Sequence, residues 1–467
     1  MRSNKNKTAV VVGGGLTGII GSILLADKFE SVYIIEKDPF CGGLLKSIED
    51  NLGINYDLGS HVPCETLIPE IDQILFGSSK NFNKEWTSLG NLRQGNFFAE
   101  KWNLETCCID ARNLNKNTYN KGIIELLSRT KKSDKKNIKS FLNETIGPTF
   151  SNNIALPIIK KLYDADPKTL TCSSSVNYFG LGRIIALTPE ITNKLKKREV
   201  FDNKLSYHTH EDYWQRKKIL EKDLPSGNYF YPKKSVGIQS WINYLLKKAI
   251  KKDVKVINKE FVEKIFHNSK QIKSIKLGNC QKEINCDFLL WTAPISLIFK
   301  AANLPLNKNN TNIKFRTSNI FHFSYDLPLL NRKSFFLWNW DVNCKGFRIT
   351  LYPNMQRKIR PSLNNVTVEV LSKKKDSIYL SLEEIDEELK KINLVSKKAK
   401  ILSKTKQIVH NTFPVPTFEF QKKIINDRDK IYETFKNIYL SGRFAGKNWF
   451  QNDVIKETYF EIKNRFG

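Results

Sequence analysis

Three glycines and one acid near the N-terminus have the types and the spacing to hold the phosphates and ribose of a dinucleotide. Gly13-x-Gly15-x-x-Gly18 is a GxGxxG pattern, and Glu36 follows it. In such a pattern the first glycine makes a tight turn, the second lets a pyrophosphate approach the backbone, and the third allows close helix–strand packing. An acid after the next strand accepts hydrogen bonds from ribose hydroxyls and disfavours a 2′-phosphate.

The elements around these glycines have the order that the motif needs. Ala9–Val12 is a short β-branched run typical of a buried parallel strand, and Leu16–Phe29 has the spacing of a helix. Ser31–Glu36 reads as a second strand, which completes a β-turn-α-β unit. The start of the helix would add unpaired N–H groups and a positive dipole end for the phosphates.

A secretory signal is the competing interpretation of the same stretch. Arg2, Lys5 and Lys7 precede an apolar run over Thr8–Ala26, like the first two regions of a signal peptide. Five glycines interrupt the run, and it divides into a strand period and a helix period. We therefore favour the dinucleotide site, and no later run is long enough for a transmembrane helix.

The length and charge of the chain set broader limits. At 467 residues it is too long for one simple core, and two or three lobes are expected. The net charge of +29 comes from lysines dispersed along the chain, and no known nucleic-acid module is present. We attribute the charge to compositional drift and expect no nucleic-acid partner, although contact with anionic membranes would follow from it.

The cysteines and histidines suggest no covalent framework and no metal site. Eight cysteines include the neighbours Cys107 and Cys108, but no CxxC pair, so a reducing cytoplasm is expected. His208-x-His210 is followed by Glu211 and Asp212, without a further ligand cluster at a known spacing. We interpret this tract as part of a charged loop or lid.

Beyond Glu36 the motifs become more specific. Gly42-Gly43 comes next, followed by Asp57, Gly59 and His61 in the sequence DLGSH. The order GxGxxG, Glu, Gly-Gly, DxGxH resembles the FAD-binding half of the amine-oxidase superfamily. Within that superfamily it is most similar to UDP-galactopyranose mutase-like and protoporphyrinogen oxidase-like proteins. The resemblance implies FAD as the cofactor, with the Gly-Gly segment along its diphosphate.

The C-terminus carries a second part of the resemblance. Gly442-Arg443 ends an expected strand, and Asn452-Asp453-Val454-Ile455 opens the final helix. The family places this helix N-terminus against the flavin pyrimidine ring, where reduced flavin carries negative charge. The family also pairs the backbone of a residue at about Val262 with the adenine.

The resemblance implies a defined set of cofactor-binding residues. They are Gly13, Gly15, Leu16, Thr17, Gly18, Glu36, Lys37, Gly42, Gly43, Leu44, Gly59, Ser60, His61, Val262, Gly442, Arg443, Asn452, Asp453 and Val454.

The expected fold is α/β, with a Rossmann-like FAD domain of the glutathione-reductase type and an α+β substrate domain. The FAD domain is expected to be discontinuous, over residues 1–95, 226–305 and 416–467. Residues 96–225 should form a mainly helical substrate or lid region. Residues 306–415 should form an antiparallel substrate-domain sheet, because 313–371 alternate with a period of two.

Two kinds of flavin chemistry fit the resemblance. One is sugar-nucleotide isomerisation, as in a mutase-like enzyme of surface-polysaccharide synthesis. The other is oxidation of the amine-oxidase, protoporphyrinogen-oxidase or phytoene-desaturase type, in which FAD takes a hydride. NAD(P)H or a partner reductase would feed the flavin. A flavin-fold protein without catalysis is a third alternative.

The expected catalytic residues are His61, Arg348 and Arg443. Arg348 lies in GFRITLYPNM, similar to a mutase-like strand that aims an arginine at the substrate, and a UDP-sugar diphosphate suits a bidentate arginine. Trp338 and Trp340 could stack on a uracil or simply fill a core. HVPCET lacks the second histidine that is usual in bacterial mutases.

Overall fold

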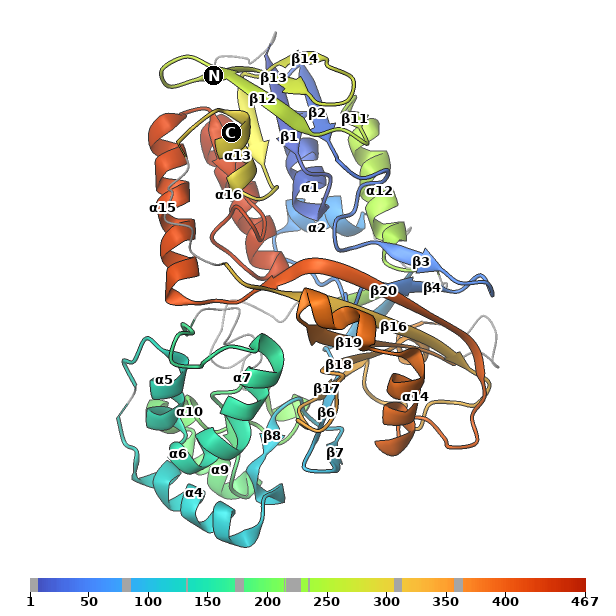
Figure 1. Cartoon of the computed structure of the whole chain (residues 1–467), viewed down its shortest axis with the longest axis vertical. Helices are drawn as coiled ribbons and strands as arrows, with labels where there is room; N and C mark the ends of the chain where they lie inside the picture. The colour runs from blue at the N-terminus through green and yellow to red at the C-terminus, as the bar shows by residue number, and fades with distance from the viewer. Residues whose placement is uncertain are drawn as a thin grey trace.

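The protein consists of two sheet-containing lobes and a helical lobe. The computed structural model describes residues 7–77, 85–131, 133–172, 180–213, 215, 228–233, 236–305, 313–356 and 364–467. In Figure 1 both termini lie at the end of the parallel-sheet lobe, the antiparallel sheet lies in the middle, and the helical lobe forms the other end. The domain boundaries expected near residues 225 and 306 lie outside the described residues, as do residues 216–218 of the expected loop.

The first lobe is built on a five-stranded parallel sheet. Its strand order is β11 (Lys255–Ile257), β2 (Ser31–Ile35), β1 (Thr8–Val12), β15 (Phe288–Trp291) and β21 (Ile438–Leu440). β1 lies at the centre because its valines are buried on both faces, as a parallel strand requires. Segments from the start, middle and end of the chain thus share one sheet, as expected of a discontinuous dinucleotide-binding fold.

Helices cover both faces of this sheet. One face packs against α1 (Leu16–Leu25), α12 (Gln239–Ile250) and α16 (Gln451–Phe466), with α2 (Pro69–Phe76) at the edge of the same core. The other face packs against α13 (Ser296–Ala301), α15 (Phe418–Thr434) and a small sheet of β12 (Val262–His267), β13 (Ile272–Leu277) and β14 (Glu283–Asn285). The apolar residues of α1 lie in this core, which agrees with the dinucleotide-binding interpretation of the stretch.

The second lobe is a seven-stranded sheet. Its order is β20 (Ile401–Pro414), β16 (Phe315–Tyr325), β19 (Asn364–Ser372), β18 (Arg348–Leu351), β17 (Phe336–Asn339), β6 (Gln94–Phe98) and β7 (Lys101–Asn103). All neighbours are antiparallel except β17 and β6. The expected sheet over 313–371 is present, and it also takes in β6 and β7 from the region expected to be mainly helical.

One face of the seven-stranded sheet packs on α14 (Leu382–Lys391) (Figure 1). Ser381 caps this helix by accepting a hydrogen bond from the Glu384 backbone N–H at 3.1 Å, as the S-x-x-E pattern requires. The 3₁₀ turns η3 (Tyr352–Asn354) and η4 (Lys374–Tyr379) follow β18 and β19. The opposite face carries polar residues described below, and its aromatic residues Phe336 and Trp338 belong to the core of the helical lobe.

The helical lobe packs around one core. It contains α4 (Lys116–Ser128), α5 (Ile138–Thr145), α6 (Pro148–Phe150), the π-helical turn η2 (Ser151–Ala155), α7 (Leu156–Tyr163), α9 (Pro189–Leu195), α10 (Glu199–Asp202) and the 3₁₀ turn η1 (Ala111–Asn113). Three strand pairs complete the protein: β3 (Ser47–Glu49) with β4 (Asn55–Asp57), β5 (Trp86–Gly90) with β10 (Tyr229–Pro232), and β8 (Ile109–Asp110) with β9 (Ile184–Ile185). Within the described ranges, no helix is both long enough and apolar enough to cross a membrane.

Candidate functional site

The turn between β1 and α1 leaves no room for side chains at two of its glycines. Gly13 has a φ of +103°, and a Cβ there would lie 2.3 Å from Thr292 Oγ1. A Cβ at Gly18 would lie 1.9 Å from the backbone oxygen of Gly13. The first glycine therefore makes the turn and the last allows the close approach of helix and strand, as the pattern predicted.

The second glycine pair lies beside the first turn. The Gly42 backbone N–H donates to Gly14 O at 2.8 Å, and Gly15 forms a bridge with Gly42. A Cβ at Gly15 would meet no atom within 4 Å, and one at Gly43 would meet only the Gly15 Cα, at 3.5 Å. These two glycines thus border open space, which we call the glycine cradle (Gly13–Gly15 with Gly42–Gly43).

The chemistry around the glycine cradle fits a dinucleotide. α1 begins at Leu16 without a side-chain cap, so its first N–H groups are available to a phosphate. Glu36 is 6% exposed, and its carboxylate accepts hydrogen bonds from the backbone N–H groups of Gly14 at 2.7 Å and Asp38 at 2.9 Å. These bonds fix an acid beside the turn, where a ribose hydroxyl would be recognised.

A cavity of about 590 Å³ lies between the two sheet lobes. Its lining includes seven of the residues expected at the site from sequence: Leu44, Ser60, His61, Arg348, Arg443, Asn452 and Asp453. Apolar and aromatic side chains form much of the remaining wall, among them Leu58, Val62, Leu67, Leu92, Ile320, Phe336, Trp338, Val409, Phe413, Trp449 and Phe450. The structure thus brings together residues from near both ends of the chain, from Leu44 to Asp453.

Arg348 is bound to an acid in the cavity wall that the sequence analysis missed. Its Nε and Nη2 donate to the two carboxylate oxygens of Glu369 at 2.6 and 2.7 Å, and the two side chains are 9% and 3% exposed. Glu369 also accepts the Ser60 backbone N–H at 3.0 Å. The arginine that was expected to meet a diphosphate therefore makes a bidentate ion pair within the protein.

His61 lies beside this ion pair. Its Nε2 is 3.1 Å from Leu58 O, and since a carbonyl can only accept, Nε2 carries the proton and Nδ1 is left as an acceptor. Burial, together with the positive charge of Arg348, lowers the pKa of His61 to about 4. The imidazole is therefore neutral at physiological pH, and it can accept a proton or a hydrogen bond at Nδ1.

The start of α16, near the C-terminus of the chain, forms part of the cavity wall. Asn452 Nδ2 donates to Cys64 Sγ at 3.0 Å and to Glu65 O at 2.9 Å, which connects the helix to the segment that carries His61. The Arg443 guanidinium lies 4.7 Å from the centre of the Trp449 ring. No side chain caps α16, so its N–H groups and positive dipole end are presented at the cavity.

A buried carboxyl group holds the segment before His61. Asp57 is fully buried and accepts hydrogen bonds from Tyr231 Oη, from Ser47 Oγ at 2.8 Å and from the Ile238 backbone N–H at 2.7 Å. Burial raises the pKa of Asp57 to about 6, although these hydrogen bonds act to lower it. The Asp57 backbone N–H donates to Tyr352 Oη at 2.9 Å, which ties this segment to the seven-stranded sheet.

Other residues expected at the site lie outside the cavity wall. Val262 opens β12 opposite Leu277, and Lys37 is exposed after β2. Val454 is buried on α16. Trp340 is fully buried in the core and stacks on Trp338 at 5.0 Å. Trp338 therefore reaches the cavity, and Trp340 supports it from behind.

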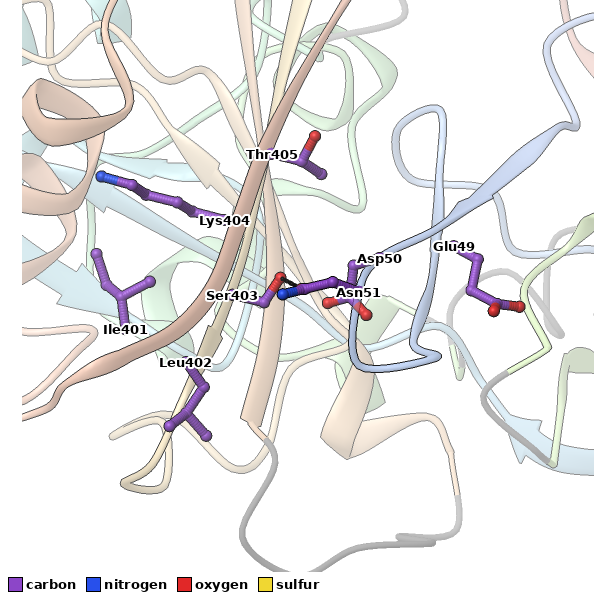
Figure 2. Close-up of a pocket in the computed structure, with 8 residues that line it drawn as sticks. All are labelled: Glu49, Asp50, Asn51, Ile401, Leu402, Ser403, Lys404 and Thr405. Atoms are coloured by element: carbon purple, nitrogen blue, oxygen red, sulfur yellow. Dashed lines mark hydrogen bonds between the residues drawn. The ribbon is translucent and has the colours of Figure 1, made fainter.

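A second hollow, of about 610 Å³, lies between the β3–β4 turn and β20, and Figure 2 shows its lining. Asn51 and Ser403 are bonded to each other at 3.0 Å, and Asp50 accepts two backbone N–H groups of its own turn. None of the residues expected at the site lines this hollow. Because it is polar and already hydrogen-bonded, we place the functional site in the other cavity.

The histidine-rich tract forms no metal site. His210 Nε2 is bonded to Gln94 of β6, and His208 lies beside Thr192 of α9. In the part of the chain that the structure describes, no group of three or more His, Cys, Asp or Glu side chains could hold a metal ion.

Comparisons of sequence match only short parts of the chain. The family model for the NAD(P)-binding Rossmann-like domain matches residues 11–66. The 4,4'-diapolycopene oxygenase of Methylomonas sp is 39% identical over 82 residues, which is 17% of this chain and 16% of that protein. The chain therefore spans about a sixth of this curated relative.

Comparisons of structure cover nearly the whole chain. A reduced UDP-galactopyranose mutase has a TM-score of 0.70 at 16% identity, covering 94% of this chain and 90% of the other. A putative protoporphyrinogen oxidase from Exiguobacterium sp. 255-15 has a TM-score of 0.69 at 11% identity, with 98% of both chains covered. A redesigned putrescine oxidase has a TM-score of 0.62 at 12% identity, covering 99% and 98%. These likenesses establish the fold of the chain.

Proposed function

We propose that the protein is a flavin-dependent oxidoreductase that binds FAD between the glycine cradle and the cavity and oxidises a largely apolar substrate. The observation that carries the proposal is the open space bordered by Gly15 and Gly43, which runs beside an uncapped helix start. The diphosphate would lie in the space beside Gly15 and Gly43 against the uncapped start of α1, and Glu36 would hold the ribose. The bound flavin would supply hydride transfer to or from the substrate.

The cavity lining supports the substrate class. Its charged residues are three basic and three acidic ones: Arg348, Arg443, Lys456, Glu65, Glu369 and Asp453. The Arg348 charge is matched by Glu369, so the wall offers little net positive charge for a diphosphate. Aromatic and aliphatic side chains form much of the remaining wall, which suits a flat or apolar molecule.

The protein's own residues would position the substrate and exclude water. Glu369 of the ion pair accepts a hydrogen bond from the Ser60 backbone N–H, and Asp57 anchors the same segment by accepting one from the Ile238 backbone N–H. His61 would then present Nδ1 at a fixed place as a hydrogen-bond acceptor. The helix start at Asn452 would favour negative charge on the flavin ring, because the dipole end there is positive.

A second candidate is the isomerisation of a UDP-sugar, as in surface-polysaccharide synthesis. Arg443 and Trp449 favour it, because together they could take a phosphate and a base at the cavity wall. The fold likeness to UDP-galactopyranose mutase, at a TM-score of 0.70, also favours it. A cytoplasmic location belongs to both proposals. Reduction of the flavin by NAD(P)H or a partner reductase belongs to the isomerase, whereas an oxidoreductase that takes a hydride from its substrate would need an electron acceptor to reoxidise the flavin.

Anaerobic absorption spectroscopy of the purified flavoprotein distinguishes the two candidates. The oxidised protein is mixed with a detergent-solubilised polyene or an apolar amine, and the reduced protein with UDP-galactose. Bleaching of the oxidised flavin by an apolar compound would support the oxidoreductase. A spectrum that UDP-galactose perturbs only when the flavin is reduced would favour the isomerase instead.

A further inference from the structure

The turn η4 presents two neighbouring apolar side chains to solvent. Ile378 is 73% exposed and Tyr379 is 77% exposed, the two highest values among the large apolar residues that the structure describes. Most exposed apolar residues on a protein surface are scattered singly. An adjacent pair of exposed apolar side chains at the tip of one turn therefore indicates a functional surface.

The protein holds this turn firmly, so the exposure is built into the fold. Lys406 Nζ donates to the backbone oxygens of Ser377 at 2.6 Å and Leu380 at 2.7 Å, on either side of the pair. Ser377 is 1% exposed and is bonded to Ser372 Oγ at 2.9 Å. The backbone of the turn is anchored on both sides, which leaves Ile378 and Tyr379 directed outward.

Positive charge precedes the exposed pair in the chain. Lys373, Lys374 and Lys375 precede it, all exposed, with Asp376 as the one acid in the turn. Lys373 is bound to Asp164 at 2.8 Å, which leaves Lys374 and Lys375 as the outer charges. Ile408, 40% exposed, follows Lys406 on the same side of β20. We call Lys374, Lys375, Ile378 and Tyr379 the basic-apolar turn.

We propose that the basic-apolar turn docks the protein on an anionic lipid bilayer. Lysines gain from a negatively charged membrane surface, and an aliphatic and a tyrosine side chain beside them can enter the headgroup region. Tyrosine is favoured there because its ring is apolar and its hydroxyl remains hydrated. A protein partner fits less well, because a stable interface buries at least about 1,200 Å² and the turn offers only two large apolar side chains.

Vesicle co-sedimentation of the purified full-length protein tests this proposal. We expect binding to vesicles of phosphatidylcholine mixed with phosphatidylglycerol, and little binding to phosphatidylcholine alone. Binding should fall steeply in about 1 M salt, where charges are screened within about 3 Å. Equal binding to both kinds of vesicle, or none to either, would overturn the proposal.

Matched variants separate the turn from the general charge of the chain. Lys374→Gln/Lys375→Gln should lower the partition coefficient roughly 30-fold, and Ile378→Ser/Tyr379→Ser roughly tenfold. The controls lie on α4, where Lys116, Lys121 and Ile124 are exposed and Leu127 is 38% exposed. Lys116→Gln/Lys121→Gln and Ile124→Ser/Leu127→Ser should bind like the wild type.

Two outcomes would contradict the assignment. If both lysine pairs lowered binding equally, the attraction would belong to the whole surface and not to the turn. If Ile378→Ser/Tyr379→Ser left vesicle binding intact but abolished self-association of the protein, the turn would be a protein interface. Neither readout depends on flavin or catalysis, so failure of this proposal is distinguishable from failure of the proposed function.

Discussion

The glycine cradle and the wall of the cavity contribute to one site by different means. In the cradle, the backbone provides the site: Gly13 turns the chain, and Gly15 and Gly43 border open space. In the wall, side chains provide it: Glu369 holds Arg348, and His61 lies beside them. A site formed by the backbone restricts which residue types can stand at fixed spacings in the sequence. A site formed by side chains can be assembled in many ways from strands that are distant in the sequence.

The difference also predicts how amino-acid substitutions act in each of the two regions. A side chain added at Gly13 or Gly18 acts through steric conflict with protein atoms, whereas one added at Gly15 enters only the open space beside the turn. A change in the wall acts through unpaired charge or altered protonation, which depends on pH and can be compensated by a second substitution. Substitutions at Gly18, Glu369, His61 and Arg443 distinguish these two kinds of effect.

Gly18→Val should have the largest effect. The new Cβ would lie 1.9 Å from Gly13 O and 3.2 Å from Val11 Cγ1, so helix α1 must move off the sheet. We expect a loss of about 3 kcal/mol or more in the free energy of unfolding, together with loss of flavin. Urea unfolding and the visible spectrum check this. Normal stability in this variant would contradict the close approach of helix and strand.

Glu369→Gln should destabilise the protein by about 3 kcal/mol, because it leaves Arg348 buried without its charge partner. Urea unfolding measures the change. The double variant Arg348→Met/Glu369→Met is the control. It should be more stable than Glu369→Gln, because replacing both charges with apolar groups removes the unpaired charge. A double variant less stable than either single one would show that the pair itself stabilises the fold.

His61→Gln should change how stability depends on pH. The pKa of His61 is lowered in the folded state, from 6.5 to about 4. Its contribution is therefore complete above pH 6.5 and is lost as the pH falls toward 4. Over this pH range the free energy of unfolding of the wild type should fall by about 2 kcal/mol relative to that of the variant. This is less than the whole pKa shift corresponds to, because the ring borders a cavity. Urea unfolding at both pH values tests this, with the exposed His267 changed to Gln as the control.

Arg443→Gln should have the smallest effect on stability. Its guanidinium lies over Trp449 at an exposed position, and such contacts contribute about 1 kcal/mol or less. The substitution should have a larger effect on ligand binding, because Arg443 lines the cavity. Titration with UDP-galactose, followed by the flavin spectrum, checks this. A variant that binds as the wild type does would remove the main observation favouring the sugar-nucleotide candidate.

The sequence predicted the parts of the fold in which the backbone determines the residue types. The cradle, the β-turn-α-β unit and the final helix could be located because glycine spacing and hydrophobic period leave few alternatives. The antiparallel alternation over 313–371 was equally clear. These patterns are local, so they are visible without knowing which strands become neighbours.

The partner of Arg348 could not be predicted, because it depends on strand register. Arg348 lies opposite Glu369 only once β18 and β19 pair. A glutamate in the otherwise β-branched NVTVEV was the one available signal, since an acid on a buried strand needs a partner. β20 lies within the sheet expected over 306–415, although polar residues such as Thr405 and Gln407 interrupt the alternation along it.

The most direct test of the account compares flavin retention in the wild type, Gly15→Val and Gly182→Ala. A side chain at Gly15 meets no protein atom within 4 Å, so it should leave the fold intact and fill only the space assigned to the diphosphate. We predict a flavin spectrum in the wild type and Gly182→Ala, and none in Gly15→Val, whose thermal stability should equal that of the wild type stripped of flavin. Full flavin occupancy in Gly15→Val, or no flavin in the wild type after addition of FAD, would contradict the account.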